Sequence, residues 1–286
     1  MDNLKAKKRH PEEIAVYSAI YVCAAFSVLL LLGIIVYVFA KGARRVNWAF
    51  LTGVTSILHG TVGIAGNILN TLIIILLTKI IKKPIGVGAA IYLNEYAKPG
   101  KLVTVIIFAT ETLAGIPSII FGLFGMLFFG QLCHMGYSLL TGSLTLTLMV
   151  LPLVTRNTQE ALKTVPDSFR TGAVGLGAGK WYTIRTILLP SAMPGIVTGV
   201  ILAIGRIIGE SAALLFTAGS AHLLPKTFDA FLEKIFHSGG TLTIQLYLSA
   251  SKGEFEVAFG IAVVLLVIVL LINFGTKRLA KKLEKH

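Results

Sequence analysis

Charge is scarce in this 286-residue chain, since only 14% of its residues are Asp, Glu, Lys or Arg, against roughly 25% in an ordinary soluble domain. Negative charge is scarcer than positive charge, with 13 Asp and Glu against 26 Lys and Arg. The two cysteines, Cys23 and Cys133, stand in apolar surroundings, which excludes a disulfide framework and a zinc-ligand spacing. We expect both to be packing residues. The chain also lacks internal repeats, which excludes a solenoid.

Long uncharged stretches are what the sequence has in abundance. Residues 14–40, 112–155 and 257–276 carry no charged side chain, and about 20 residues cross a bilayer as a helix. The stretches do not alternate as barrel strands do, so the predicted fold class is all-α, a polytopic membrane bundle. We predict six spans, at 14–40, 62–81, 101–124, 137–155, 192–218 and 257–276. A turn around 130–136 joins the third and fourth spans, and Lys82-Lys83-Pro84 is expected to break the second.

The distribution of positive charge predicts the orientation in the membrane. Most Lys and Arg fall in the two tails and in the loops 79–101 and 156–185. The loops on the other side of the membrane hold only Lys41, Arg44, Arg45, Lys226, Lys234 and Lys252. The positive-inside rule then places both termini in the cytoplasm, with 41–45 as the exception. The lipid bilayer, and no nucleic acid, therefore accounts for the net charge of +13.

Three regions follow from this topology. Residues 1–60 hold the tail, the first span and an external loop; 61–276 form the membrane core with the cytoplasmic loop 156–190; and 277–286 are a basic cytoplasmic tail. The first apolar run is too long for the core of a cleaved signal peptide, which spans about 7–15 residues. We therefore expect it to remain as a membrane helix.

The loop 156–190 carries the most informative motif. Its Gly175-Leu176-Gly177-Ala178-Gly179-Lys180 is not a nucleotide-binding P-loop, because Val174 occupies the first-glycine position and Trp181 follows the lysine. We expect a helix-turn-helix instead, with Asp167 or Ser168 as N-cap. Its glycines form the turn, and a second helix over 180–188 leads into the fifth span. Such a projection suits docking to a soluble partner.

This window resembles the coupling loop of ABC-importer permeases. Gly177, Ile187, Leu189 and Pro190 stand at the family's spacing and Ala173 matches its last alanine, whereas Thr171 and Gly172 replace the family's Glu and first Ala. In the family that carboxylate helps to anchor the loop to the nucleotide-binding subunit. Here the resemblance leaves the anchoring to other groups, for which the candidates are Asp167, Arg170, Lys180 and Arg185.

Other segments, at 91–96, 115–125, 165–170 and 205–212, are similar to phosphate permeases of the PstA type. The resemblance implies a type I (MetI-like) ABC-importer permease in the cell membrane, a transport subunit rather than an enzyme, with no catalytic residue. The implied partners are a PstC-like sister permease, two PstB-like subunits that hold ATP and Mg, and an external PstS-like phosphate-binding protein. No cofactor or metal is expected on this chain.

Charged and amide side chains within the spans are the candidates for the translocation pathway. Arg206 and Glu210 lie four residues apart, on one face of the predicted fifth span, where a charge costs about 2.5–3.5 kcal/mol. We expect Arg206 to meet the substrate dianion with Glu210 holding the guanidinium; the alternative is that the two merely neutralise each other. Glu111, Asn67 and Asn70 are further candidates, although the asparagines have an alternative role in hydrogen bonding between helices.

Three rival functions stay open at this point. A permease of the same fold for sulfate or molybdate is one, because specificity in the family resides largely in the external binding protein. A proton-coupled secondary transporter would use Glu111, Arg206 and Glu210 as a relay and would show paired broken helices in two repeated halves, which the sequence does not show. The third is a membrane scaffold or sensor without flux.

Overall fold

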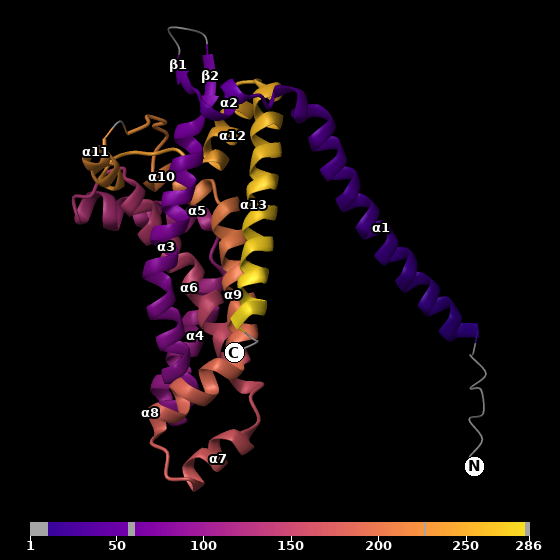
Figure 1. The fold of residues 1–286 in the computed structure, drawn as a ribbon, viewed down its shortest axis with the longest axis vertical. Helices are drawn as coiled ribbons and strands as arrows, with labels where there is room; N and C mark the ends of the chain where they lie inside the picture. The colour runs from indigo at the N-terminus through magenta and orange to yellow at the C-terminus, as the bar shows by residue number, and fades with distance from the viewer. Residues whose placement is uncertain (1–10, 57–60, 226, 284–286) are drawn as a thin grey trace.

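The computed structural model describes residues 11–56, 61–225 and 227–283, and the chain is mostly helical (Figure 1). The longer helices are α1 (Pro11–Gly42), α3 (Ala65–Ile91), α4 (Lys101–Gly115), α6 (Leu139–Lys163), α9 (Leu189–Gly209), α12 (Leu242–Ser251) and α13 (Phe255–Leu283). The shorter ones are α2 (Trp48–Thr52), α5 (Ser118–Gly125), α7 (Asp167–Gly175), α8 (Lys180–Thr183), α10 (Ala212–Thr217) and α11 (Phe228–Glu233). Tighter or wider helical turns are η1 (Ala43–Arg45), η2 (Tyr92–Tyr96), η3 (Met126–Leu132), η4 (Ile184–Leu188) and η5 (Lys234–Phe236).

The central bundle consists of α3, α6, α9 and α13, in which α3 packs against α6, α6 against α9, and α9 against α13. Helix α7 lies at one end, and the antiparallel hairpin of β1 (Val54–Ser56) and β2 (Thr61–Ile64) lies at the other, with Val54 opposite Ile64 (Figure 1). Helix α1 meets the bundle at the hairpin end, beside α13, and then diverges from it. The start of α1 and the end of α13 both point toward the end where α7 lies.

Several helices are long and apolar enough to cross a membrane. They are Ala15–Arg45, Leu139–Lys163, Lys180–Gly209 and Phe255–Arg278, and the bent pair Lys101–Gly115 and Ser118–Leu132 adds a fifth span if counted as one. The expected second span, 62–81, falls largely in α3, which is not among them. Helix α3 also runs unbroken past Pro84, so the predicted break at Lys82-Lys83-Pro84 is wrong. Close packing explains this, because Gly86 brings α3 directly against Val154 of α6.

Two of the predicted spans are broken helices rather than continuous ones. The third, expected over 101–124, bends by 104° between α4 and α5. Pro117 lacks an N–H and keeps Ile116 extended, at ψ 131°. The fifth, expected over 192–218, ends as α9 at Gly209, because Glu210 is extended (ψ 122°) before α10 begins.

The two short halves after these breaks, α5 and α10, pack against each other. A Cβ atom added at Gly122 would lie 2.8 Å from the Cα of Ala213, and one at Gly125 would lie 2.0 Å from the Thr145 hydroxyl and 2.9 Å from Thr217. Only glycine permits this approach. The structure therefore contains a pair of broken helices that the sequence analysis did not expect.

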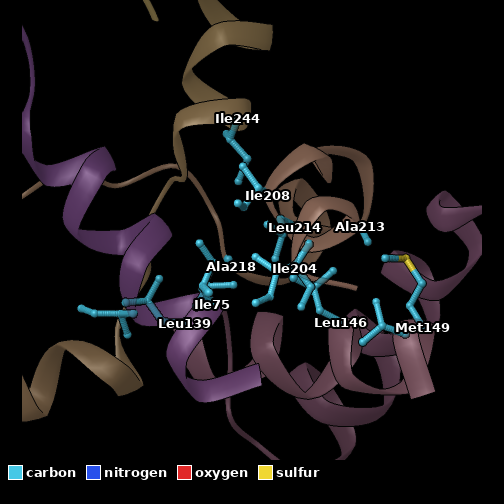
Figure 2. Packing of buried hydrophobic residues seen from close by; sticks show 14 of the residues in the cluster. Ile75, Leu139, Leu146, Met149, Ile204, Ile208, Ala213, Leu214, Ala218 and Ile244 are labelled. Atoms are coloured by element: carbon cyan, nitrogen blue, oxygen red, sulfur yellow. The ribbon is translucent and has the colours of Figure 1, made fainter. Parts of the chain in front are cut away.

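A hydrophobic cluster joins the bundle around this contact (Figure 2). It includes Ile75 of α3, Leu139, Leu146 and Met149 of α6, Ile204 and Ile208 of α9, Ala213, Leu214 and Ala218 at α10, and Ile244 of α12. Helix α6 is also rich in buried hydroxyls, and those of Ser143, Thr145 and Thr147 each donate to the carbonyl four residues earlier. Because α6 satisfies its own polar groups, several helices can surround it.

Helix α1 lies apart from this core. No residue in its apolar window is buried, and it contacts the rest of the chain mainly through α13 and η1. Cys23 in α1 is exposed, as is Cys133 after η3, so the expectation that both cysteines pack in the interior is wrong. The exposed apolar side chains of α1 are suited to lipid or to another membrane protein.

Gly125→Val should destabilise the bundle, because the added atoms collide with Thr145 and Thr217. Overpacking of this kind costs about 1–3 kcal/mol. The measurement is the melting temperature of the purified chain in detergent. Gly88→Val in α3 is the matched control, since a Cβ atom added there meets no atom within 4 Å in the described residues. Equal melting temperatures for the two variants would contradict the prediction.

Candidate functional site

The loop between α6 and α9 folds as two short helices joined by a glycine turn, as predicted. Helix α7 ends in a turn where the Ala178 N–H donates to the Ala173 carbonyl and the Gly177 N–H to that of Val174, both at 2.9 Å. This Schellman arrangement needs a residue in the left-handed region, and Gly177 has φ +80°. Helix α8 then continues through η4 into α9. Asp167 is the first residue of α7 and not its N-cap, which is Pro166.

Arg170 clamps α7 onto the end of the bundle. Its Nη2 lies 2.9 Å from Glu95 Oε1, and its Nη1 donates to Asp167 Oδ1 at 3.0 Å. The same guanidinium donates to the carbonyls of Leu162 and Val165 near the end of α6. The Arg170 and Glu95 side chains are 22% and 8% exposed. The hydrogen bonds to Glu95 raise the pKa of Arg170 above its ordinary value. The Arg170 guanidinium therefore stays positively charged throughout the accessible pH range.

The turn η2 also touches the second half of the loop. Lys180 Nζ lies 4.7 Å from the centroid of the Tyr96 ring, which is a cation–π contact. Thr171, which stands where the family's Glu would be, is exposed and donates its hydroxyl within α7, to Asp167 and Ser168 carbonyls. The anchoring candidates Arg170 and Lys180 therefore hold the loop to this chain's own η2.

The remaining loop residues divide between the interior and the surface. Ala173 is buried, and Ile187 and Leu189 pack half-buried against a cluster that includes Leu162, Ile184, Leu188 and Ile196. Gly172 and Pro190 are exposed. The cluster joins the ends of α3 and α6 to η4 and α9, so the loop is packed onto the helices that it connects.

The outer surface of the loop carries five large exposed apolar or aromatic side chains. Leu176 at its tip is 90% exposed, and Phe169, Val174, Trp181 and Tyr182 are exposed as well. An exposed apolar patch rimmed by polar residues commonly marks a protein interface. The sequence analysis did not select these five residues, although a leucine and a tryptophan inside a polar loop were a signal for them.

Arg206 and Glu210 are not placed as predicted. Glu210 lies outside α9, and its Oε1 accepts a hydrogen bond from the Ala213 N–H at 3.1 Å, at the start of α10. Arg206 is exposed, and no hydrogen bond or ion pair involves its guanidinium anywhere in the described ranges. The break at Glu210 removes the shared helical face, so the expectation that Glu210 holds Arg206 is wrong.

The structure brings Arg206 together with Glu111 and Arg156 instead. These three line a cavity of about 210 Å³ between α4, α6 and α9, with Thr110, Ala114, Met149, Pro152 and Leu153. Thr110, Glu111 and Arg156 also line a second cavity, of about 170 Å³, which reaches Lys163 at the end of α6. Arg156 lies 3.2 Å from Glu160 and 4.0 Å from Glu111. A charged furrow thus leads from Arg206 toward the loop between α6 and α9.

Asn67 and Asn70 lie away from this furrow, near the start of α3 and so at the hairpin end of the molecule. Both are fully buried. Asn67 Nδ2 donates to the Gly240 carbonyl at 3.0 Å, and Asn70 Nδ2 donates to those of Gly240 and Ala221 at 3.0 and 3.1 Å. These hydrogen bonds attach the connection between α10 and α12 to α3. The side-chain oxygens of both residues are buried without a partner in the described residues.

The sequence matches a family model along most of its length. Residues 84–286 match the family described as binding-protein-dependent transport system inner membrane component. The chain belongs to this family. It is therefore a subunit of a transport system in the membrane rather than an enzyme, and it is a multi-pass membrane protein.

Curated relatives of this permease agree with the family assignment. It is 34% identical to the probable ABC transporter permease protein YqgI of Bacillus subtilis, over 92% of this chain and 93% of the relative. It is equally 34% identical to the phosphate transport system permease protein PstA of Xylella fastidiosa, over 84% and 82% of the two chains. It shares 34% identity with PstA 1 of Mycobacterium tuberculosis, over 79% and 70%.

Solved structures show that the fold is that of an ABC-importer permease. A bacterial alginate ABC transporter, crystallised with its alginate pentasaccharide-bound periplasmic protein, matches with a TM-score of 0.71 at 14% identity, over 96% of both chains. The MetNI methionine ABC transporter matches with a TM-score of 0.59 at 20% identity, over 75% of this permease and 93% of that chain. At these identities the likeness concerns the fold alone.

Glu95 and Arg156 belong to the two sites but are not among the residues predicted from the sequence. Glu95 was nonetheless conspicuous, because it is the only Asp or Glu between residues 14 and 110. Its partner Arg170 lies 75 residues away, so pairing the two required the tertiary structure. Arg156 was assigned to the cytoplasmic loop, because the predicted fourth span ended at 155, whereas α6 continues to Lys163.

Arg170→Ala should loosen α7 while leaving the bundle folded. Removing one partner of a largely buried ion pair costs about 3–5 kcal/mol, so amide exchange in α7 should accelerate by at least about tenfold. Hydrogen–deuterium exchange of the purified chain measures this. Glu95→Ala should have a similar effect, and the double variant should add little to either. Arg185→Ala is the control, since Arg185 is exposed and has no ion pair in the described segments; unchanged exchange in Arg170→Ala would contradict the clamp.

Proposed function

We propose that this chain is a permease subunit of an ATP-driven phosphate importer, forming half of the translocation pathway and receiving motion from a nucleotide-binding partner. The observation that carries the proposal is the projection of α7 and α8. It is a rigid two-helix element with an exposed apolar tip on a membrane protein of the importer-permease family. Phosphate is the proposed substrate because the relatives include several PstA phosphate permeases.

The coupling step follows from how the loop is attached. Residues Thr171, Gly172 and Gly177 lie on its exposed side, and the apolar tip around Leu176 would enter a groove of the nucleotide-binding subunit. Because α8 continues through Ile187, Leu189 and Pro190 into α9, a displacement of the loop moves α9 directly. The Arg170 clamp passes the same displacement to η2, which precedes α4. ATP-driven closure of the partner would in this way move both walls of the charged furrow.

The pathway itself is proposed to run beside Arg206. Its guanidinium has no counterion in the part of the chain that the structure describes, and it faces a cavity that also contains Arg156. A phosphate dianion can take two parallel hydrogen bonds from such a fork. Glu111 in the same cavity would weaken the grip and allow release. Glu210, at the break between α9 and α10, shapes the backbone beside Arg206, and Asn67 and Asn70 would hold the outer end of the pathway in place.

The partners and the orientation complete the proposal. We infer a sister permease for the second half, two subunits that hold ATP and Mg, and an external phosphate-binding protein. Both ends of the described chain point toward the α7 end, which supports a cytoplasmic location for both termini and for the coupling loop together. The 61–276 region would form the permease core.

The rival functions fare differently. Paired broken helices are present after all, which removes one argument against a proton-coupled transporter, but the family assignment favours an ATP-driven one. A sulfate or molybdate permease of this family remains the second candidate, because Arg206 would serve any tetrahedral oxyanion. Competition by these anions in the uptake assay described below decides between them.

Leu176→Glu should weaken the attachment of the nucleotide-binding subunit, because it places a charge in the proposed apolar contact. The side chain is 90% exposed, so folding should be unaffected. We expect the amount of copurifying nucleotide-binding subunit, and the transport-coupled ATPase activity, to fall at least about tenfold, as for a buried hot-spot residue. Leu223→Glu, 72% exposed at the other end of the molecule, is the control; full copurification in Leu176→Glu would exclude the tip as the docking surface.

Arg206→Ala should abolish uptake of radiolabelled phosphate in the assembled transporter, with assembly intact. Loss of a charge-assisted bidentate contact costs about 1.5–3 kcal/mol or more, so uptake should drop at least about tenfold. Arg206→Lys keeps the charge and should retain part of the uptake. Excess sulfate and molybdate should not compete in the wild type. Normal uptake by Arg206→Ala would give Arg206 a structural role only.

A further inference from the structure

The junction of α1 and α13, at the end of the molecule opposite the coupling loop, is a tightly built corner. A Cβ atom at Gly42 would lie 2.3 Å from the Phe259 carbonyl oxygen, so the two backbones are in direct contact. The Tyr37 and Phe259 rings meet edge to face, with centroids 5.6 Å apart. The turn η1 closes the corner. Its shape is therefore fixed by backbone contacts, not by flexible side chains.

This corner contains a polar cavity of about 710 Å³ with an excess of positive charge. It is lined by Tyr37, Ala40, Lys41, Arg44, Arg45, Phe255, Glu256 and Phe259. Lys41, Arg44 and Arg45 face one carboxylate, that of Glu256. Across residues 11–56, 61–225 and 227–283, no ion pair or hydrogen bond involves the side chains of the three cations. The cavity therefore has three positive groups without a bound counterion.

Arg45 gives the second indication of a ligand. Its side chain packs against Gly260 and lies 6.0 Å from the centroid of the Phe50 ring. Its Nε is buried, yet no acceptor in the described residues receives its hydrogen. A buried donor without a partner destabilises the folded state. An anion bound in the corner would accept hydrogen bonds from the Arg45 guanidinium and so offset that cost.

These cations are also the exception to the charge distribution of the chain. Positive residues gather at the cytoplasmic ends of membrane proteins, whereas Lys41 lies in the last turn of α1 and Arg44 and Arg45 in η1, and α1 ends far from α7 (Figure 1). A specific anionic ligand on that side of the membrane explains why three of them occur together there.

The surroundings identify the kind of anion. Below the corner, α1 and α13 diverge (Figure 1), and both carry exposed apolar side chains along their length, such as Ile34 and Leu30 in α1 and Leu270 and Leu271 in α13. A ligand with a phosphate at the corner and hydrocarbon beneath it matches both features. We propose that the corner binds the phosphate group of an anionic phospholipid, with its acyl chains between α1 and α13.

The side chains suit this ligand chemically. Arg44 and Arg45 can each present two donors to phosphate oxygens, and Lys41 adds a point charge. Tyr37 sits where aromatic residues accompany headgroups. Glu256 carries the same charge as the anion and therefore weakens its binding, so the three cations must outweigh this one carboxylate. Such a lipid would fix the angle between α1 and the bundle.

The test uses the full chain reconstituted in nanodiscs of phosphatidylcholine with increasing phosphatidylglycerol. Lipid retention is read by native mass spectrometry, and melting temperature is measured in parallel. Lys41→Gln and Arg44→Gln should each weaken phosphatidylglycerol retention about fivefold, which corresponds to about 1 kcal/mol per cation near an anionic surface. Glu256→Gln should strengthen retention, which a damaged fold would not do. Lys252→Gln, an exposed cation outside the cavity, should change nothing.

A second arm separates the two sources of a phosphate group. Inorganic phosphate is added to the chain in pure phosphatidylcholine. Stabilisation by phosphatidylglycerol but not by inorganic phosphate supports the lipid site. Stabilisation by inorganic phosphate that depends on Lys41 and Arg44 would show that the free ion is the ligand and overturn the lipid assignment. Equal phosphatidylglycerol retention in the wild type, Arg44→Gln and Glu256→Gln would overturn the site altogether.

Discussion

The fold depends on one constraint, which is that backbone N–H and C=O groups must find partners when a helix breaks inside a membrane protein. The chain breaks at Pro117 and at Glu210, and at the second break some of the contacts that supply these partners come from distant segments. The Glu210 carbonyl accepts from the Thr243 hydroxyl, and its carboxylate caps α10. The Thr217 and Ala218 carbonyls at the end of α10 accept from the N–H groups of Ser138 and Gly239. The segments after α10 are thereby held to the bundle.

The same constraint explains the buried asparagines. The connection between α10 and α12 has no regular secondary structure over much of its length, so its carbonyls need external donors. Asn67 and Asn70 supply them from α3. Their amides thus support the two broken helices from outside. This accounts for fully buried asparagines in a helix that is otherwise packed with isoleucine.

The α7 end of the molecule and the helix bundle are connected by two routes that start from the loop between α6 and α9. One route is covalent and runs through η4 into α9. The buried cluster that includes Leu162, Ile184 and Leu188 packs along this route. The other is the ion pair of Arg170 with Glu95, which reaches the segment before α4. Helices α4 and α9 are two of the three walls around Arg206 and Glu111. In the proposed mechanism, a displacement of the loop would therefore change the distance between the groups that line the furrow.

The sequence alone determined the features that depend on neighbouring residues. The apolar length of α1, the turn before α6 and the glycine turn at Gly177 were predictable, because hydrophobic length and positive φ are local properties. The break at Pro117 was also locally encoded, although the uncharged run around it concealed it. Only the tertiary structure decided which distant groups lie together: Glu95 is paired with Arg170, Arg206 shares a cavity with Glu111 and Arg156, and the asparagines bind the far connection. Those depend on which helices become neighbours, and a helix break such as that at Glu210, stabilised by contacts from distant segments, changes which side chains share a face.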